Sequence, residues 1–356
     1  MTRPPAWSII APIAGGVLLA GTAAGWRGPF LALVAVGLAA CILAAVHHAE
    51  HLALILGEPY GTMLLAIAVT VIELGLIVTL TVAGGESAES LARDTVYAAI
   101  MIILNGIVGL CLLVGGLRFR EQEFKLQGAS ASLTTLAAIA VLTLVLPNFT
   151  STMPGPYYSR GQLALVALTT LVLYATFALV QGSRHREHFV EDEDEEVGSA
   201  AAGTGGGGWA LTSVLLAACL AAVVLLAKSL APVIERTVAA AGAPSAVVGV
   251  VIAALVLMPE GLAAYRAARI NRLQSSLNLA LGSALASIGL TIPAVALLSI
   301  ATGWRLALGL DALSMVLLAL SLFVAALSLG TGRTTILQGA VHLVLFAIYL
   351  FTTVVP

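Results

Sequence analysis

The chain has 356 residues, of which 60% are hydrophobic and only 10% are charged, and its mean hydropathy is +1.05. A water-soluble domain carries about a quarter charged residues because its surface faces water, so this composition excludes an ordinary soluble protein. The formal net charge of −2, without a basic stripe, also excludes a nucleic-acid-binding role.

Apolar runs of about 20 residues recur along the whole chain, and each can cross a hydrocarbon core of about 30 Å. Backbone groups in lipid must be satisfied within their own segment, so these runs predict helices, and their length excludes barrel strands. We therefore predict an all-α polytopic membrane protein with about 11 transmembrane helices. The predicted spans are 7–26, 29–48, 59–83, 94–117, 127–147, 161–182, 209–229, 244–268, 275–300, 304–328 and 334–355.

The start of the chain and its short loops indicate the orientation. Arg3 and the apolar run after it are typical of a secretory signal, but further spans follow at once, so we expect an uncleaved leading helix. Cytoplasmic loops are enriched in Lys and Arg. With the N-terminus inside, ten of the 16 Lys and Arg residues lie on the cytoplasmic side. We predict a multi-pass protein of the inner (plasma) membrane with its N-terminus in the cytoplasm and its C-terminus outside.

The composition changes abruptly between the sixth and seventh spans. Six consecutive acidic residues, 191–196, are followed by a glycine-rich run, 203–208. Such a stretch cannot bury a core, so we expect a flexible cytoplasmic linker; the alternative is that the acidic run binds calcium loosely as a sensor. The expected parts are a leading helix at 1–28, a first five-helix repeat at 29–183, the linker at 184–208 and a second five-helix repeat at 209–356.

The two five-helix groups place polar residues at matching positions. The first helix of each group carries one acid deep in an apolar run, Glu73 in the first and Glu260 in the second. The helix that follows carries Asn105 in the first group and Ser287 in the second. Because five is odd, the second group enters the membrane from the opposite side. The pattern therefore predicts an inverted repeat, which places a transport site near the bilayer midplane.

The two intramembrane glutamates are the main candidates for chemistry. Glu73 lies about 15 residues, or about 20 Å, into its span. An ionised carboxylate there costs several kcal/mol unless it is paired, and no Lys or Arg lies at similar depth. Such a group can hold a proton in one state and a cation in another, which is the simplest chemistry of exchange. The alternative is a protonated glutamate that is hydrogen-bonded to a neighbouring helix.

Neutral oxygen atoms are needed to complete a cation site. Calcium takes several oxygen ligands, whereas sodium and potassium need fewer. Backbone carbonyls freed near Pro259 are one source. The candidate side chains are Thr70, Asn105, Ser283 and Ser287. A lone amide such as that of Asn105 can equally bridge two helices.

A histidine cluster ends the second predicted span. His47, Glu50 and His51 fit the H-x-x-E-H pattern of one zinc peptidase class, and with His48 they resemble a histidine box of membrane di-iron oxygenases. Because none of the other three histidines is grouped suitably for a second box, we expect instead an amphipathic helical end that faces water near the site entrance, where histidine can also sense pH. Glu58, before the third span, is either a helix-start carboxylate or a cation ligand in the vestibule.

Several longer runs resemble the calcium/proton exchanger (CAX) family of the calcium/cation antiporter superfamily, most closely its bacterial ChaA-type branch. The runs are 48–50, 57–62, 68–77, 93–97, 105–110, 116–122, 146–150, 259–261 and 278–287, and the resemblance covers nearly the full chain. It implies eleven spans in one leading helix plus two inverted five-helix repeats. It also implies export of cytoplasmic calcium in exchange for protons, or sodium or potassium/proton exchange, with the family's polar positions on Asn105 and Ser287.

The same resemblance places the family glutamates on Glu73 and Glu260. The family commonly has Gly-Asn shortly before each glutamate, whereas this chain has Val69-Thr70 and Val256-Leu257. Because calcium needs many oxygen ligands, this departure keeps monovalent exchange as an alternative. The expected partners are inorganic cations, protons and the lipid bilayer. We expect a secondary transporter with no cofactor and no enzyme activity.

Overall fold

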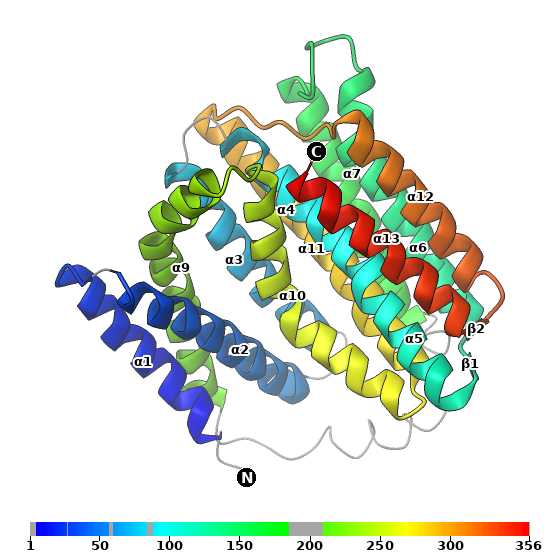
Figure 1. Cartoon of the computed structure of the whole chain (residues 1–356), viewed down its shortest axis with the longest axis horizontal. Coiled ribbons are helices and arrows are strands. Elements are labelled where there is room, and N and C mark those ends of the chain that lie inside the picture. The colour runs from blue at the N-terminus through cyan, green and yellow to red at the C-terminus, as the bar shows by residue number, and fades with distance from the viewer. Residues whose placement is uncertain (1–4, 27, 57–59, 84–87, 185–208, 356) are drawn as a thin grey trace. The chain divides into compact units, whose positions relative to one another are not determined.

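The structure is a computed structural model that describes all residues except 1–4, 27, 57–59, 84–87, 185–208 and 356 (Figure 1). Within the described residues, 11 helical stretches are long and apolar enough to cross a membrane, which confirms the predicted fold class and number of spans. The α-helices are α1 (Ala6–Ala23), α2 (Phe30–Leu56), α3 (Tyr60–Ala83), α4 (Ala88–Met101), α5 (Val108–Phe119), α6 (Leu126–Ala140), α7 (Arg160–Leu179), α9 (Trp209–Ala240), α10 (Ala246–Arg269), α11 (Leu273–Thr302), α12 (Ala312–Leu329) and α13 (Ile336–Val354).

Among the described residues, three of the spans contain helical turns of a different pitch. Ile102–Ile107 is a π-helical segment that joins α4 to α5, so these elements form one long span. After α6 the chain continues as the π-helical segment Val141–Val145 and the 3₁₀ turn Leu146–Phe149, and α7 ends in the π-helical segment Val180–Arg184. A π turn inserts one residue into a helix and changes the direction of the side chains around it. The first of these segments contains Asn105.

The beginning of the tenth span differs from the prediction. We expected a helix from residue 304, but α12 begins only at Ala312. Residues before it form an irregular strap, in which the N–H of Ala307 donates to the carbonyl of Glu89 at 3.0 Å and the N–H of Leu310 donates to Leu144 at 2.8 Å. Because these N–H groups donate to carbonyl groups of other segments, they are not available for the hydrogen bonds of a helix.

Contacts divide the chain into two compact units, each of which takes helices from both halves of the sequence. The first unit covers residues 1–88 and 196–248 and contains α1, α2, α3 and α9. Small residues allow its helices to approach closely, as is usual in membranes. A Cβ atom added to Gly15 of α1 would lie 2.9 Å from Cys41 Sγ on α2 and 3.3 Å from the Ala222 Cβ on α9.

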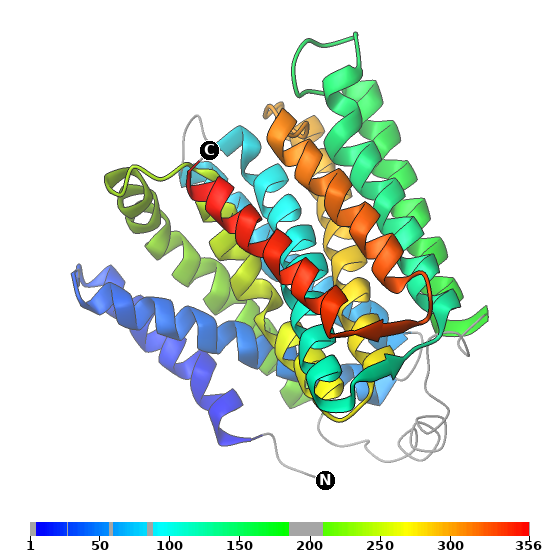
Figure 2. The same cartoon turned by 45° about the vertical axis from the view of Figure 1, so that its right-hand side comes forward.

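The second unit covers residues 89–195 and 249–356. α11 packs against α5, α6 and α7, and α13 packs along α5 (Figures 1 and 2). Glycines again permit the contact, because a Cβ atom on Gly339 of α13 would overlap the backbone nitrogen of Leu113 on α5.

Two short strands connect the ends of α5 and α13. β1 (Glu121–Glu123) pairs antiparallel with β2 (Arg333–Thr335), as Figure 2 shows. Arg333 forms an ion pair with Glu123 at 2.9 Å. Hydropathy does not predict this pairing, because both strands are short and polar and lie in loops between spans.

We expect Gly339→Ala to destabilise the protein by about 1–3 kcal/mol, the usual effect of overpacking, because backbone atoms of α5 cannot yield to the new methyl group. Thermal unfolding of the detergent-solubilised protein measures the effect. Gly161→Ala on α7 is the matched control, since nothing lies within 4 Å of its added Cβ. Equal melting temperatures for the two variants would contradict the close approach of α13 and α5.

Candidate functional site

Glu73 lies in the middle of α3, in the first unit. It is 13 residues after the helix start at Tyr60 and 10 before the end at Ala83, which is about 20 Å and about 15 Å along the helix. Its side chain is 2% exposed. Thr70, one turn earlier, is also buried, and its hydroxyl donates to the carbonyl of Ala66 at 2.8 Å. The Thr70 hydroxyl therefore uses its proton within the helix, and the residue lies on the same face of α3 as Glu73.

Glu260 occupies the corresponding place in α10, in the second unit. It lies 14 residues after Ala246 and 9 before Arg269, about 21 Å and about 14 Å from the helix ends. The helix is continuous through Pro259. Glu260 is half-buried, and Leu257, one turn earlier on the same side, is 3% exposed and apolar.

The second unit brings α10 close to the segment that carries Asn105. A Cβ atom on Gly261, next to Glu260, would lie 3.2 Å from the Cδ1 atom of Ile107 at the end of the π-helical segment. α11 packs against the same segment. It carries Ser283 and Ser287 one turn apart, and Ser287 is buried. α10, which carries Glu260, and α11, which carries the two serines, therefore each contact the segment that carries Asn105.

Asn105 itself is fully buried and its amide is bonded on both sides. Its Nδ2 atom donates to Ser321 Oγ on α12 at 2.7 Å, and its Oδ1 atom lies 3.1 Å from Nδ1 of His342 on α13. Ser321 and His342 are also 0% exposed. We did not predict either residue from the sequence. The signal was present for His342, because an ionisable residue within an apolar span is by default a functional candidate.

The histidine cluster lies inside α2 rather than at its end, since α2 continues to Leu56. The expectation that its side chains face water is wrong for His48, which is 1% exposed and places Nε2 at 3.1 Å from the carbonyl of Ser8 on α1. His51 is half-buried, and only Glu50 is exposed. Burial replaces solvation at His48 because α1 packs directly over this part of α2.

Two predictions fall on parts that the structure leaves out. Glu58 and the acidic run 191–196 lie outside the described residues. Among the residues that are described, no group of three or more His, Cys, Asp or Glu side chains could hold a metal ion.

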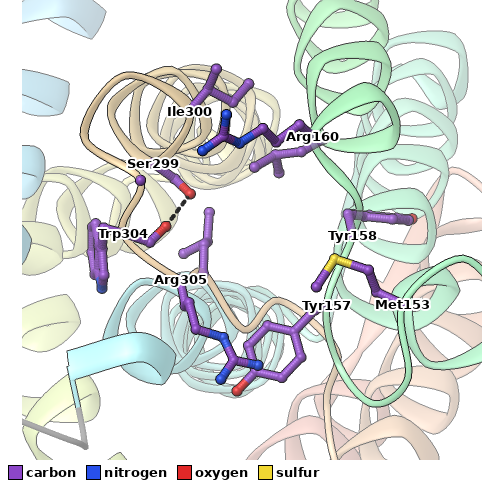
Figure 3. Close-up of a pocket in the computed structure, with 11 residues that line it drawn as sticks. Met153, Tyr157, Tyr158, Arg160, Ser299, Ile300, Trp304 and Arg305 are labelled. Atoms are coloured by element: carbon purple, nitrogen blue, oxygen red, sulfur yellow. Dashed lines mark hydrogen bonds between the residues drawn. The ribbon is translucent and has the colours of Figure 1, made fainter.

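A cavity of about 160 Å³ lies elsewhere in the second unit, where the loop before α7 meets the end of α11 (Figure 3). The guanidinium of Arg305 lies 4.5 Å from the centre of the Tyr157 ring. The Tyr157 hydroxyl donates to the Glu89 carboxylate at 2.7 Å, and this bond raises the pKa of Tyr157. None of the residues predicted to bind a cation lines this cavity.

Asp311 caps α12, and we expect Asp311→Asn to lower the melting temperature at neutral pH by an amount equivalent to about 0.3–1 kcal/mol, because asparagine can still cap the helix but lacks the negative charge at its N-terminus. The Asp311 carboxylate accepts one hydrogen bond from the Ser314 N–H at 2.9 Å and another from the Ser314 hydroxyl at 2.7 Å. Burial opposes ionisation of Asp311, but the Ser314 bonds and Arg93 lower its pKa below 3.8 overall. The stabilisation by the Asp311 carboxylate is therefore fully present at pH values above the ordinary pKa of aspartate. It is lost as the pH falls through the lowered pKa of Asp311 in the folded protein. Thermal unfolding of the wild type and of Asp311→Asn between about pH 6 and about pH 3 measures this stabilisation. If the difference between the two melting temperatures does not shrink in acid, the ionised Asp311 is not its source.

Comparison with known proteins places the chain among ion exchangers. The family model described as "Sodium/calcium exchanger protein" matches residues 29–182 and 211–355. The chain is 48% identical over 356 residues to the putative ionic transporter y4hA of Sinorhizobium fredii, covering 99% of this chain and 97% of that protein. It is 37% identical over 323 residues to the sodium-potassium/proton antiporter ChaA of Escherichia coli, and this match covers 90% of this chain and 87% of that protein.

A solved structure supports the same fold. The structure of native YfkE matches with a TM-score of 0.75 and covers 98% of this chain and 100% of that one. A second structure of YfkE describes it as a Ca²⁺/H⁺ antiporter. At 18% identity this likeness shows the fold alone. The family match over most of the chain and the relative at 48% identity show that the protein belongs to the sodium/calcium exchanger family.

Proposed function

We propose that this protein is a secondary active antiporter that exports cytoplasmic calcium in exchange for protons, with Glu73 and Glu260 as the groups that bind the cation and the proton. The observation that carries this proposal is the pair of glutamates in the middle of two membrane helices of 24 residues each. Membership of an exchanger family supports transport by exchange. An intramembrane carboxyl group is costly as an unneutralised ion, so it tends to be retained for a function.

Competition at the carboxyl groups couples the two ions. A carboxylate that is far from water is stable only when a proton or a cation neutralises it. Binding of the cation therefore requires release of protons, and arrival of protons expels the cation. Exchange follows when the protein can expose the loaded site to either side of the membrane in turn. Thr70, Asn105, Ser283 and Ser287 are proposed to supply neutral oxygen ligands.

The proposed topology has two inverted five-helix repeats at 29–183 and 209–356 after a leading helix at 1–28, in an inner membrane with the N-terminus in the cytoplasm. The family model matches two separate segments that nearly coincide with these repeats, which supports internal duplication. The linker at 184–208 would then lie in the cytoplasm.

A second candidate is sodium or potassium/proton exchange at the same residues. Two observations favour it. ChaA, 37% identical to this chain, is described as a sodium-potassium/proton antiporter. The turn before Glu260 presents apolar Val256 and Leu257, which are both buried and supply no side-chain oxygen. Monovalent cations need fewer oxygen ligands than calcium does.

Exchange in everted membrane vesicles tests the proposal and separates the two candidates. Vesicles carrying the protein are given a pH gradient, and calcium, sodium or potassium is then added separately over a range of pH. An antiporter dissipates the gradient when its own cation is added, and we expect calcium to do so at the lowest concentration. Vesicles in which no cation affects the gradient would refute the proposal. A response to sodium or potassium alone would select the second candidate.

Membership of a family of ion exchangers does not support an enzyme site at the histidine cluster. The family is one of ion exchangers, and its relatives are described as transporters and antiporters. His48 uses its ring to bind the backbone of α1 instead. A role for His48, His51, Glu50 and Glu58 in regulation or at the cytoplasmic entrance stays a proposal.

A further inference from the structure

The contact between His342 and Asn105 determines which ring nitrogen of the neutral histidine carries the hydrogen. The Oδ1 atom of Asn105 carries no hydrogen, so the bond at 3.1 Å requires a hydrogen on Nδ1 of His342. In the neutral ring, Nε2 is then an acceptor. This Nε2 atom is buried and has no hydrogen-bond partner among the described residues. The ring thus donates to Asn105 while its own acceptor remains unsatisfied.

Local sequence explains how the histidine reaches Asn105. Gly106 and Gly109 present no side chain toward α13: a Cβ on Gly106 would lie 3.3 Å from the Phe346 ring, and one on Gly109 would lie 2.8 Å from the His342 Cβ. The surrounding π-helical turn changes the direction of Asn105 relative to a regular α-helix. Both features bring the amide and the imidazole into hydrogen-bonding contact.

Packing alone does not account for a histidine at this place. A buried acceptor without a partner costs free energy, and an apolar side chain would fill the space between α5 and α13 without that cost. The remaining property of the imidazole is its Nδ1–H donor. That donor fixes the amide oxygen of Asn105, while Ser321 Oγ accepts from the amide nitrogen.

We propose that His342 is a positioning residue for Asn105: together with Ser321 it prevents rotation of the amide and holds one lone pair of Oδ1 ready to bind the transported cation. This inference rests on the proposed function, in which Asn105 is a neutral ligand. A carbonyl oxygen has two lone pairs, so the bond from His342 leaves one for a cation. An amide that is already oriented loses less entropy when the cation binds, which raises affinity.

Exchange kinetics of His342→Leu and His342→Gln in proteoliposomes test the inference. The leucine variant removes the donor and the unsatisfied acceptor together. We expect it to raise the half-saturating cation concentration about fivefold, the equivalent of one hydrogen bond, with a melting temperature close to that of the wild type. The glutamine variant retains an N–H donor and should restore most of the affinity. Ser321→Ala should also raise the half-saturating concentration, whereas Ser328→Ala, a buried serine two turns later on α12, should not.

The outcomes distinguish this inference from the proposed function. If the wild-type protein exchanges cations and His342→Leu has the same half-saturating concentration, the inference is overturned and the function stands. The inference also fails if glutamine is no better than leucine, or if the leucine variant only lowers the melting temperature and the amount of folded protein. A wild-type protein that exchanges no cation refutes the proposed function itself.

Discussion

Replacing Glu260 by glutamine is expected to abolish cation/proton exchange, and Glu73→Gln is expected to do the same. Glutamine has nearly the shape of glutamate but can neither release a proton nor neutralise a cation. Removal of one partner from a buried charge pair costs about 3 kcal/mol or more, which corresponds to at least about 100-fold in affinity. The measurement is dissipation of a pH gradient in everted vesicles, normalised to the amount of folded protein.

The matched control for both variants is Glu123→Gln. Glu123 lies on β1, is 69% exposed and pairs with Arg333 on β2. Surface ion pairs contribute little to stability, so this variant should exchange cations at the rate of the wild-type protein. Unchanged exchange in both Glu73→Gln and Glu260→Gln would refute their role as the binding groups. Loss in only one of them would restrict proton coupling to that glutamate.

The spans were predictable because a single physical constraint dominates them. Crossing hydrocarbon requires about 20 apolar residues with an internally bonded backbone, and eleven such runs were visible in the sequence. Helix ends were harder to predict. The predicted second span ends at residue 48, because spans are ended at Gly, Pro and charge, whereas α2 continues to Leu56 and its buried His48 bonds to α1. The late start of α12 depends on hydrogen bonds between distant segments, which no local pattern contains.

The candidate residues were predictable as types but not as contacts. Glu73 and Glu260 are recognisable from the sequence because charge within an apolar span is rare. The partners of Asn105 were not recognisable, since His342 lies 237 residues away along the chain and Ser321 is one of many serines. Their meeting depends on a π-helical turn and on glycines whose importance appears only when α13 packs against α5.

The number of oxygen ligands near Glu260 bears on the choice between calcium and monovalent cations. Leu257 precedes Glu260 by three residues, on the same side of α10. Thr70 stands in the same relation to Glu73 on α3 and provides an oxygen, whereas Leu257 provides none. If the number of oxygen ligands limits calcium binding, an amide at position 257 should relieve that limit.

Leu257→Asn is therefore expected to lower the half-saturating calcium concentration about tenfold relative to Leu257→Ala, with a smaller change for sodium and potassium. A bond to a charged group contributes about 1.5–3 kcal/mol, and 1.4 kcal/mol already corresponds to a factor of ten. Leu257→Ala is the control because both variants lose the packing of a buried leucine, which alone costs about 2–5 kcal/mol of stability. Exchange measured with each cation in proteoliposomes gives the comparison. The same calcium dependence in both variants would show that the side chain at position 257 does not set the preference. The selectivity would then have to come from ligands other than those on the turn before Glu260.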